Sequence, residues 1–228
     1  MNKIKNLFSV DLEDWYHAYG NIDQILNTSK NFHKYNHQSI LSKGCEKILE
    51  IIERKKIKST FFILGQVAKN NKSLIRQISN LGHEIASHGY NHLPIYLMNK
   101  SELKEDLHKS KILLEDIVGK EIISYRAPSF SLKFENIKDF YDTLSELGYQ
   151  YSSSSSDGVS DFGGDPKLPN QIKKYLTKNE KYILEFPSSN YSFFFNKFNP
   201  VGGGYIRLLN KNLIRFFANR LINNNIPL

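Results

Sequence analysis

The sequence predicts an α/β fold in which helices cover a parallel sheet, and two observations lead to this prediction. Short, mostly apolar segments alternate along the chain with longer segments whose apolar residues recur at helical spacing. The connections between them are short, which favours parallel strands joined by crossover helices. With 228 residues, 40% of them hydrophobic, the chain can form one substantial core, and α/β barrels commonly reach this size as a single domain. We therefore expect one domain over residues 1–228.

Six segments have the composition and length of strands. They are NLFSVDL (6–12), STFFILG (59–65), HEIASHG (83–89), ISYRAPS (123–129), YQYSSSS (149–155) and YILEFPS (182–188). Helical patterns lie between them, at residues 39–56, 67–81, 101–118 and 136–147. Gly82, Gly119 and Gly148 each follow the last apolar position of such a pattern, where a left-handed residue commonly ends a helix.

Two segments interrupt the alternation. Residues 152–169 (SSSSSDGVSDFGGDPKLP) have turn-forming residues throughout and predict a long loop. Residues 198–205 (FNPVGGGY) carry three consecutive glycines before a final helical pattern. Loops of this kind in compact domains are often functional.

The composition argues against several classes of protein. Cys45 is the only cysteine, which rules out an internal disulfide and a multi-cysteine metal cluster. The net charge of +8 comes from lysines scattered among asparagines and isoleucines, without the basic cluster and interleaved aromatic residues of a nucleic-acid site, so no nucleic-acid partner is expected. No run of 18 apolar residues exists, so no transmembrane segment is predicted. The N-terminus enters a strand without an apolar leader, and we expect a cytoplasmic protein.

The stretch SHGYNH (87–92) places His88 and His92 four residues apart in a chain with seven histidines. Neutral imidazole is the commonest protein ligand of zinc, and this spacing lets two rings converge on one ion, although two loop histidines also fall this close by chance. The overlapping GHEIASH is not the helical zinc motif of metalloproteases, because one residue too many separates His83 from His88. A metal site at His88 and His92 needs a third protein ligand.

Polar residues gather at the ends of three predicted strands. They are Asp11, Glu13 and Asp14 on the first, His88 and His92 on the third, and Arg126 on the fourth. In a parallel α/β barrel the carboxyl ends of all strands open onto one face, so these side chains are expected to meet there. The acidic residues of the first strand are therefore candidates for the third ligand.

Taken together, SVDLEDW (9–15), SHGYNH (87–92) and YRAPSF (125–130) resemble the polysaccharide deacetylases of the NodB-homology type, carbohydrate esterase family four. The opening SVDLEDWYH and the later LEFPSS and GGGYIRL are most similar to the subgroup associated with exopolysaccharide and cell-surface glycan loci. The resemblance covers nearly the whole chain. It implies a distorted (β/α)7-type NodB barrel and a hydrolase that removes N-acetyl groups from sugars of a surface polysaccharide or its precursor.

The resemblance also implies roles for individual residues. Asp11 matches the general base of the family, and Arg126 matches the arginine that orients it. His88 and His92 match the two metal histidines, on Zn²⁺ or another divalent transition metal. The resemblance leaves two candidates for the acidic metal ligand. Asp14 corresponds to the ligand position in the family's motif, whereas Glu13 points to the same side of an extended strand as Asp11.

The chemistry implied is attack of an activated water on the acetamide carbonyl of an N-acetylated glycan, with Asp11 as proton acceptor. Residues that flank the motifs are candidates for binding the sugar, or for packing: Trp15, Tyr16, Tyr90, Pro128 and Phe130.

The match fails at the histidine that acts as general acid in a late strand of the family. No histidine follows Arg126, so we expect the sequence to end before that strand and activity of this chain to be in doubt. His17, His33 and His37 are candidate substitutes, and Glu185 either shapes the site or is structural. Two other functions remain as alternatives: a catalytically impaired glycan-binding or scaffold protein of the same fold, and an amidohydrolase acting on a small non-sugar C–N bond.

Overall fold

A computed structural model of the chain describes residues 6–14, 17, 38–160, 163–193 and 196–224. These residues fall into two compact units. The N-terminal unit comprises Phe8–Leu93 and Leu97–Pro128, and the C-terminal unit consists chiefly of the residues after Pro128 together with Pro94–Tyr96. The single domain expected over residues 1–228 stays a prediction.

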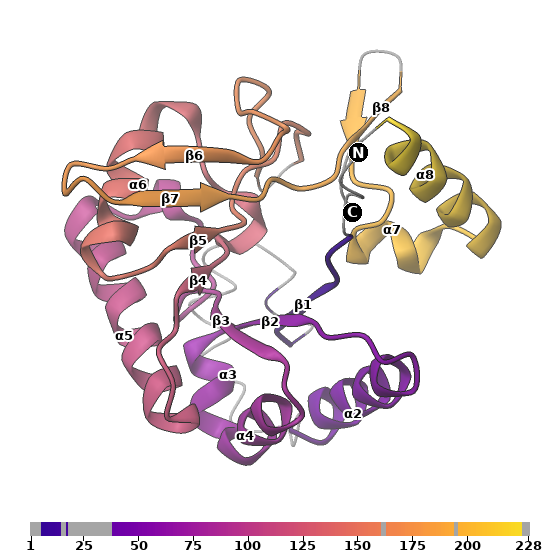
Figure 1. The fold of residues 1–228 in the computed structure, drawn as a ribbon, viewed down its shortest axis with the longest axis horizontal. Helices are drawn as coiled ribbons and strands as arrows, with labels where there is room; N and C mark the ends of the chain where they lie inside the picture. Colours follow the sequence, from indigo (N-terminus) through magenta and orange to yellow (C-terminus); the bar gives the residue numbers. More distant parts are fainter. Residues whose placement is uncertain (1–5, 15–16, 18–37, 161–162, 194–195, 225–228) are drawn as a thin grey trace. The chain divides into compact units, whose positions relative to one another are not determined.

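The N-terminal unit is built on four parallel strands in the order β1-β2-β3-β4. These are β1 (Ser9–Leu12), β2 (Thr60–Ile63), β3 (Glu84–Ser87) and β4 (Ser124–Tyr125). Helices accompany them along the outer side of the unit (Figure 1): α2 (Gln38–Arg54), α3 (Gly65–Asn70), α4 (Lys72–Asn80) and α5 (Lys100–Val118). All four strands lie inside predicted strand segments, so the alternation of strand and helix is confirmed here.

One predicted helix is two helices in the structure. The pattern at 67–81 predicted a single helix, but α3 begins earlier, at Gly65, and ends before Asn71, after which α4 begins. The Asn71 side-chain amide donates to the Val67 carbonyl at 2.8 Å, and the Asn71 backbone N–H donates to the Ala68 carbonyl instead. Val67 offers the carbonyl that this N–H would bond in a continuous helix, so the asparagine side chain competes with the helix at this point.

The helix ends that glycine predicted are confirmed. Gly82, Gly119 and Gly148 all have positive φ, between 67° and 83°. The other end of α5 is fixed by a capping box, in which the Asn99 side chain accepts from the Glu102 backbone and the Glu102 carboxylate accepts from the Asn99 backbone. Both ends of α5 are therefore set by local side-chain and backbone chemistry.

In the C-terminal unit, β5, β7 and β6 lie side by side in that order, where β5 pairs with β7 in parallel and β6 pairs with β7 antiparallel. The sequence did not predict β6, because its residues KKYL are mostly exposed and lack an apolar face. The strands are β5 (Tyr151–Ser152), β6 (Lys173–Leu176) and β7 (Tyr182–Glu185), with a separate hairpin of β8 (Tyr191–Phe193) and β9 (Asn196–Phe198). The helices are α6 (Ile137–Glu146), α7 (Gly203–Leu208) and α8 (Lys211–Asn223). Short 3-10 turns occur at Ile95–Leu97 (η3), Pro128–Phe130 (η4) and Phe134–Asn136 (η5).

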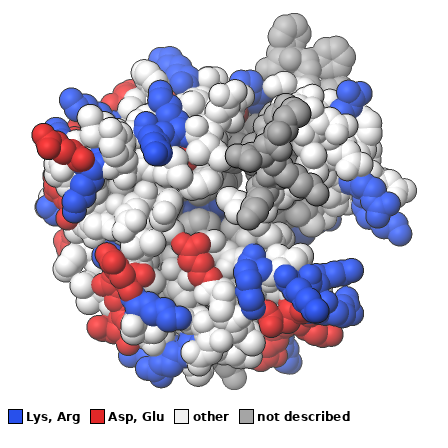
Figure 2. Space-filling view, in the orientation of Figure 1, with Lys and Arg blue, Asp and Glu red and all other residues white. Residues whose placement is uncertain are grey.

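Each unit has its own apolar core. Phe61, Ile75 and Leu107 are fully buried in the N-terminal unit, as are Leu144 and Ile183 in the C-terminal unit. Acidic and basic side chains lie interspersed on the face of the molecule that Figure 2 shows. Among the described helices, none is both long and apolar enough to cross a bilayer.

Candidate active site

The carboxyl ends of β1, β3 and β4 position the polar residues that the sequence singles out. Glu13 comes just after β1, His88 directly follows β3, and Arg126 directly follows β4. Parallel pairing continues past the strands, since His88 N–H donates to Ile63 O at 3.0 Å and Arg126 N–H donates to Ser87 O at 2.9 Å. These side chains all belong to the N-terminal unit, where the parallel strands end at one edge.

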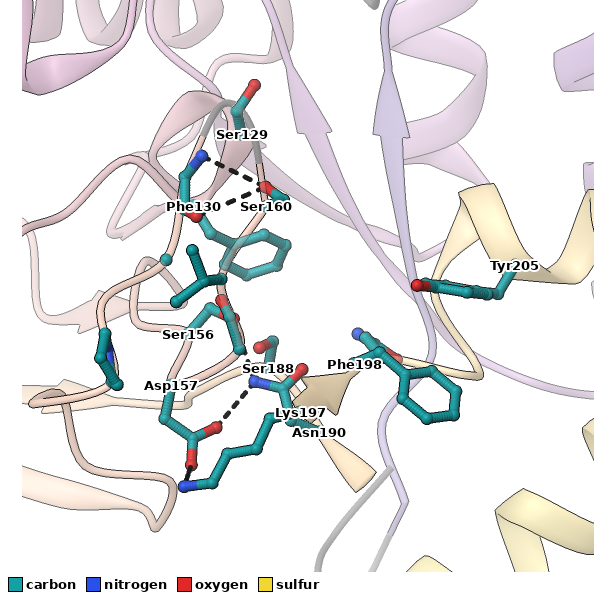
Figure 3. A pocket seen from close by; sticks show the side chains of 16 residues that line it. Ser129, Phe130, Ser156, Asp157, Ser160, Ser188, Asn190, Lys197, Phe198 and Tyr205 are labelled. Atoms are coloured by element: carbon teal, nitrogen blue, oxygen red, sulfur yellow. Dashed lines mark hydrogen bonds and ion pairs between the residues drawn. The ribbon is translucent and has the colours of Figure 1, made fainter. Parts of the chain in front are cut away.

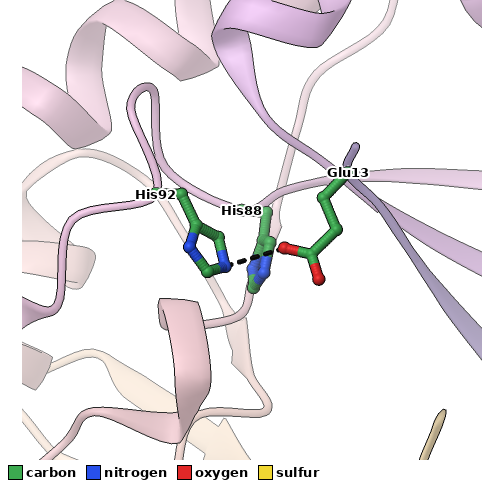
Figure 4. Close-up of side chains that lie close together, drawn as sticks. All are labelled: Glu13, His88 and His92. Carbon is green, nitrogen blue, oxygen red and sulfur yellow. Dashed lines mark ion pairs between the residues drawn. The ribbon is translucent and has the colours of Figure 1, made fainter. Parts of the chain in front are cut away.

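Glu13, His88 and His92 form a cluster whose ligand atoms all lie within 4.8 Å of one another (Figure 4). His92 Nε2 lies 2.8 Å from Glu13 Oε2, but the two atoms lack the alignment of a hydrogen bond. Glu13 Oε2 is buried and has no hydrogen-bond partner in the described part of the chain. A buried carboxylate oxygen in this state, beside two imidazoles, suits a shared divalent cation.

The hydrogen bonding of His88 prepares it to bind a metal. His88 Nδ1 lies 2.8 Å from the carbonyl oxygen of Arg126. Because a carbonyl oxygen only accepts, Nδ1 must carry the proton, and the lone pair of Nε2 is left for a metal ion. Burial lowers the pKa of His88 by more than the Asp11 carboxylate raises it. The side chain, 2% exposed, therefore favours the neutral form that metals bind.

The carboxylate of Glu13 is held in its ionised form. Burial raises its pKa, but close contact with His92 and the charge of His88 lower it further, so the net shift is downward. The cluster thus offers two imidazoles and one carboxylate, a ligand set that suits Zn²⁺ and related divalent ions and leaves room for a further, non-protein ligand. The residues present fit a catalytic metal.

Backbone contacts hold the loop that carries the two histidines. Gly89 and His92 have φ of +78° and +59°, a left-handed conformation that is uncommon for residues other than glycine. The N–H groups at the start of α3 donate to this loop, from Gly65 to Gly89 O at 2.9 Å and from Gln66 to Tyr90 O at 3.1 Å. A strained backbone that its surroundings fix in this way is typical of functional sites.

Asp11 and Arg126 form an ion pair beside the cluster. Arg126 Nη1 donates to Asp11 Oδ1 at 2.7 Å, and the guanidinium lies 4.0 Å from the centre of the Phe62 ring. Burial raises the pKa of Asp11, but the charges of Arg126 and His88 and the hydrogen bond from Arg126 lower it further, so its pKa is below the ordinary value. The arginine therefore keeps Asp11 ionised and fixes its orientation.

The other candidates from the sequence lie in different surroundings. Asp14 is buried and is not part of the Glu13 cluster. The Tyr90 ring packs over Gly65, with Lys109 Nζ 3.9 Å from the ring centre, which is a packing role. Pro128 is buried, and Phe130 lines a cavity of the C-terminal unit. Several candidates lie outside the described residues: Trp15, Tyr16, His33 and His37.

The structure places His17 beside His92, which the sequence did not predict. Its side chain is 2% exposed, and its ring centre lies 5.8 Å from that of His92. Asp14 N–H donates to His17 Nδ1 at 2.9 Å, so the neutral ring carries its proton on Nε2. Burial and the nearby His92 lower the pKa of His17 to about 4. The position of His17 depends on the hydrogen bond from its N–H to Asp14 O. No local sequence pattern predicts this contact.

Glu185 has structural surroundings. It is fully buried in the C-terminal unit, where its carboxylate accepts from the backbone N–H groups of Ser154 and Ser155 at 2.7 and 2.8 Å and from the Tyr141 hydroxyl at 3.0 Å. These contacts fix the start of the serine-rich loop. Of the two roles open to Glu185, the contacts favour the structural one.

The geometry in the N-terminal unit combines two chemical functions. Two imidazoles and a carboxylate can hold a divalent ion, and an ionised aspartate fixed by an arginine can accept a proton. Metal-assisted hydrolysis requires both functions close together.

Comparison with known proteins identifies the family and several relatives of the chain. Residues 33–152 match the family model described as polysaccharide deacetylase. A peptidoglycan-N-acetylglucosamine deacetylase of Bacillus cereus is 33% identical over 105 residues, which are 45% of this chain and 46% of that protein. A peptidoglycan deacetylase of Helicobacter pylori is 28% identical over 111 residues, 49% of this chain and 36% of that protein. The matched segment thus spans less than half the length of these relatives.

A solved structure extends the likeness to almost the whole fold. The crystal structure of a Mycobacterium smegmatis protein described as a polysaccharide deacetylase covers 95% of this chain and 72% of its own, with a TM-score of 0.66 and 22% identity. At this identity the likeness shows the fold alone, and it confirms the α/β fold of the NodB type. Because the family model matches more than half of the 228 residues, the chain belongs to the polysaccharide deacetylase family, the NodB-homology group of carbohydrate esterase family four.

Proposed function

We propose that this protein is a metal-dependent hydrolase that removes N-acetyl groups from sugar residues of a surface polysaccharide or its precursor. The observation that carries the proposal is the cluster of Glu13, His88 and His92 at the same strand ends as the Asp11–Arg126 ion pair. Family membership supports the reaction class. The names of the Bacillus and Helicobacter relatives support an acetylated cell-envelope sugar as the class of substrate.

In this proposal each residue has a defined task. Glu13, His88 and His92 hold the ion, and Arg126 holds Asp11 in an orientation and charge state suited to taking a proton from the attacking water. A bound divalent ion such as Zn²⁺ supplies Lewis-acid polarisation of the acetamide carbonyl. The Arg126 carbonyl keeps His88 in the tautomer that presents Nε2.

Glu13 is the proposed acidic ligand, and Asp14 is the alternative. Glu13 lies two residues beyond Asp11, and its oxygen lies with the imidazole nitrogens. Asp14 directs its backbone N–H to His17. The two adjacent acids make a matched pair of variants for testing the assignment.

A second candidate function is glycan binding without turnover. Residues 127–228 contain no histidine, and in the family a histidine of a late strand protonates the departing amine. Within this chain a different group must therefore supply that proton. This observation favours an impaired catalyst, whereas the retained Asp11, His88 and His92 favour hydrolysis.

The test combines metal content with acetate release. We expect chelator-treated and zinc-reloaded protein to bind one zinc per chain, measured by elemental mass spectrometry. His88→Ala and His92→Ala should lose it, as should Glu13→Gln, whereas Asp14→Asn should retain it. His108→Ala changes an exposed histidine of α5 and is the control.

Acetate release from an N-acetylated cell-envelope glycan then separates the two functions. Release that needs zinc supports the hydrolase, and zinc binding without release supports the binding protein. A folded parent protein that binds no zinc would overturn the metal-dependent mechanism.

A further inference from the structure

We propose that the C-terminal unit carries a sugar-binding site of its own residues, which takes an uncharged N-acetylated pyranose ring of the glycan. The choice of ligand rests on the proposed function. The site is a cavity of about 610 Å³, within the range of small-molecule sites. Its lining includes Phe130, Asp157, Asn190, Lys197, Phe198 and Tyr205 (Figure 3).

The wall of the cavity that comes from the serine-rich segment is tightly built. A Cβ at Gly163 would lie 1.8 Å from the carbonyl oxygen of Ser129, and one at Gly164 would lie 1.8 Å from that of Gly158. Gly164 N–H donates to Phe130 O at 2.9 Å, which ties the two walls together. The cavity is therefore largely formed before a ligand arrives, which reduces the entropy cost of binding.

The polar floor of the cavity is organised around a buried charge. Asp157 is 3% exposed and accepts from Lys197 Nζ at 2.6 Å and from Asn190 Nδ2 at 2.8 Å. Asn190 Nδ2 also donates to Ser156 Oγ at 3.0 Å. Both amide hydrogens of Asn190 are thereby used, which leaves Oδ1 to accept from a ligand, and the Lys197 ammonium has two further N–H donors.

The charges of the lining balance. Among the lining residues that the structure describes, Asp157 and Lys197 are the only charged ones, and they neutralise each other. An anionic ligand would have to compete with Asp157 for Lys197. The lining therefore favours an uncharged ligand that carries both donors and acceptors.

A further polar group points to a ligand. Ser188 lines the cavity and is 8% exposed, and its hydroxyl has no hydrogen-bond partner among the described residues. Buried hydroxyl groups are normally paired, so this one is suited to a ligand hydroxyl or amide.

Aromatic rings supply the apolar part of the site. Figure 3 shows Phe130 on one side of the cavity and Phe198 and Tyr205 on the other. The Phe198 and Tyr205 ring centres are 5.1 Å apart, and Tyr205 is 40% exposed. A pyranose has an apolar face of C–H groups and a polar edge of hydroxyls, which matches aromatic rings above a polar floor.

The experiment measures binding of N-acetylchitotetraose to the full chain by isothermal titration calorimetry, after chelator treatment so that no turnover occurs. We expect the parent protein to bind, Tyr205→Ala to bind about tenfold more weakly, and Tyr205→Phe, which keeps the ring, to bind like the parent. Phe216→Ala is the matched control, because Phe216 is an exposed aromatic residue of α8 that does not line the cavity. Ser188→Ala, a smaller change, should also weaken binding.

The outcomes separate this site from the proposed hydrolase. Weaker binding in Tyr205→Ala, with unchanged binding in His92→Ala, supports the cavity whether or not the parent protein releases acetate. Unchanged binding in Tyr205→Ala and Ser188→Ala overturns it, even if acetate release establishes the hydrolase. A parent protein that does not bind the tetrasaccharide overturns it as well.

Discussion

At the residue scale, Asp11 depends on Arg126 for both charge and direction. The 2.7 Å contact keeps the carboxylate ionised in a partly buried position. A positioned base of this kind contributes a factor of about 10²–10⁴ to rate. We expect Asp11→Asn to lower kcat for acetate release by that factor while zinc content stays at the parent level. Loss of zinc together with activity would instead make Asp11 part of the metal site.

The pKa of His17 leads to a pH dependence of stability. Its pKa is about 4 in the folded protein and near 6.5 when unperturbed. Between these values the unfolded chain binds a proton that the folded chain does not, so the free energy of unfolding falls as pH falls through this window and is level above it. The effect is on the order of 3 kcal/mol.

We therefore expect His17→Gln to flatten the dependence of the free energy of unfolding on pH between about 6.5 and about 4. Urea unfolding of metal-free protein at several pH values measures this. His108→Gln changes an exposed histidine and should leave the slope unchanged. An unaltered slope in His17→Gln would show that folding does not lower the pKa of His17.

The sequence singled out the residues that gather in the candidate site and the strands that carry them, because strand ends and histidine spacing are local properties. Which of Glu13 and Asp14 faces the two histidines depends on the direction of the chain after β1, and the local sequence does not determine that direction. The place of His17 depends on a turn back toward His92. Both are tertiary properties that a single sequence expresses only once the chain is folded.

At the scale of elements, the strand–helix alternation was predictable because apolar periodicity is strong in both strands and helices. The prediction was wrong where a single polar side chain changes the outcome, as Asn71 does between α3 and α4. It missed β6, whose exposed KKYL has no buried face to mark it as a strand.

Glu185 connects β7 to the loop that follows β5. Its carboxylate is the acceptor for two buried backbone N–H groups. Loss of an acceptor costs about 1–3 kcal/mol for each buried donor left unpaired. We expect Glu185→Ala to lower the free energy of unfolding by about 2–6 kcal/mol, measured by urea denaturation. The exposed Glu135→Gln should change it little, and an equally small effect at Glu185 would contradict the structural role.

At the scale of the whole molecule, a metal that binds only the folded chain stabilises it by mass action. At a free zinc concentration 100 times the dissociation constant the gain is about 2.7 kcal/mol. We expect a chelator to lower the melting temperature of the parent protein, measured by differential scanning calorimetry. His92→Ala should melt at the same temperature with and without the chelator. A parent protein insensitive to the chelator would argue against the metal site.

The packing of Tyr90 on Gly65 links two positions that are distant in sequence. A Cβ at residue 65 would lie 2.2 Å from the Tyr90 ring, so an aromatic residue at 90 requires glycine at 65. The two sites should therefore show reciprocal sign epistasis in a library that randomises both. Alanine at 65 should be selected only together with a small side chain at 90. Evolutionary substitution of Gly65 should therefore require a simultaneous substitution of Tyr90 in the loop that carries the two histidines.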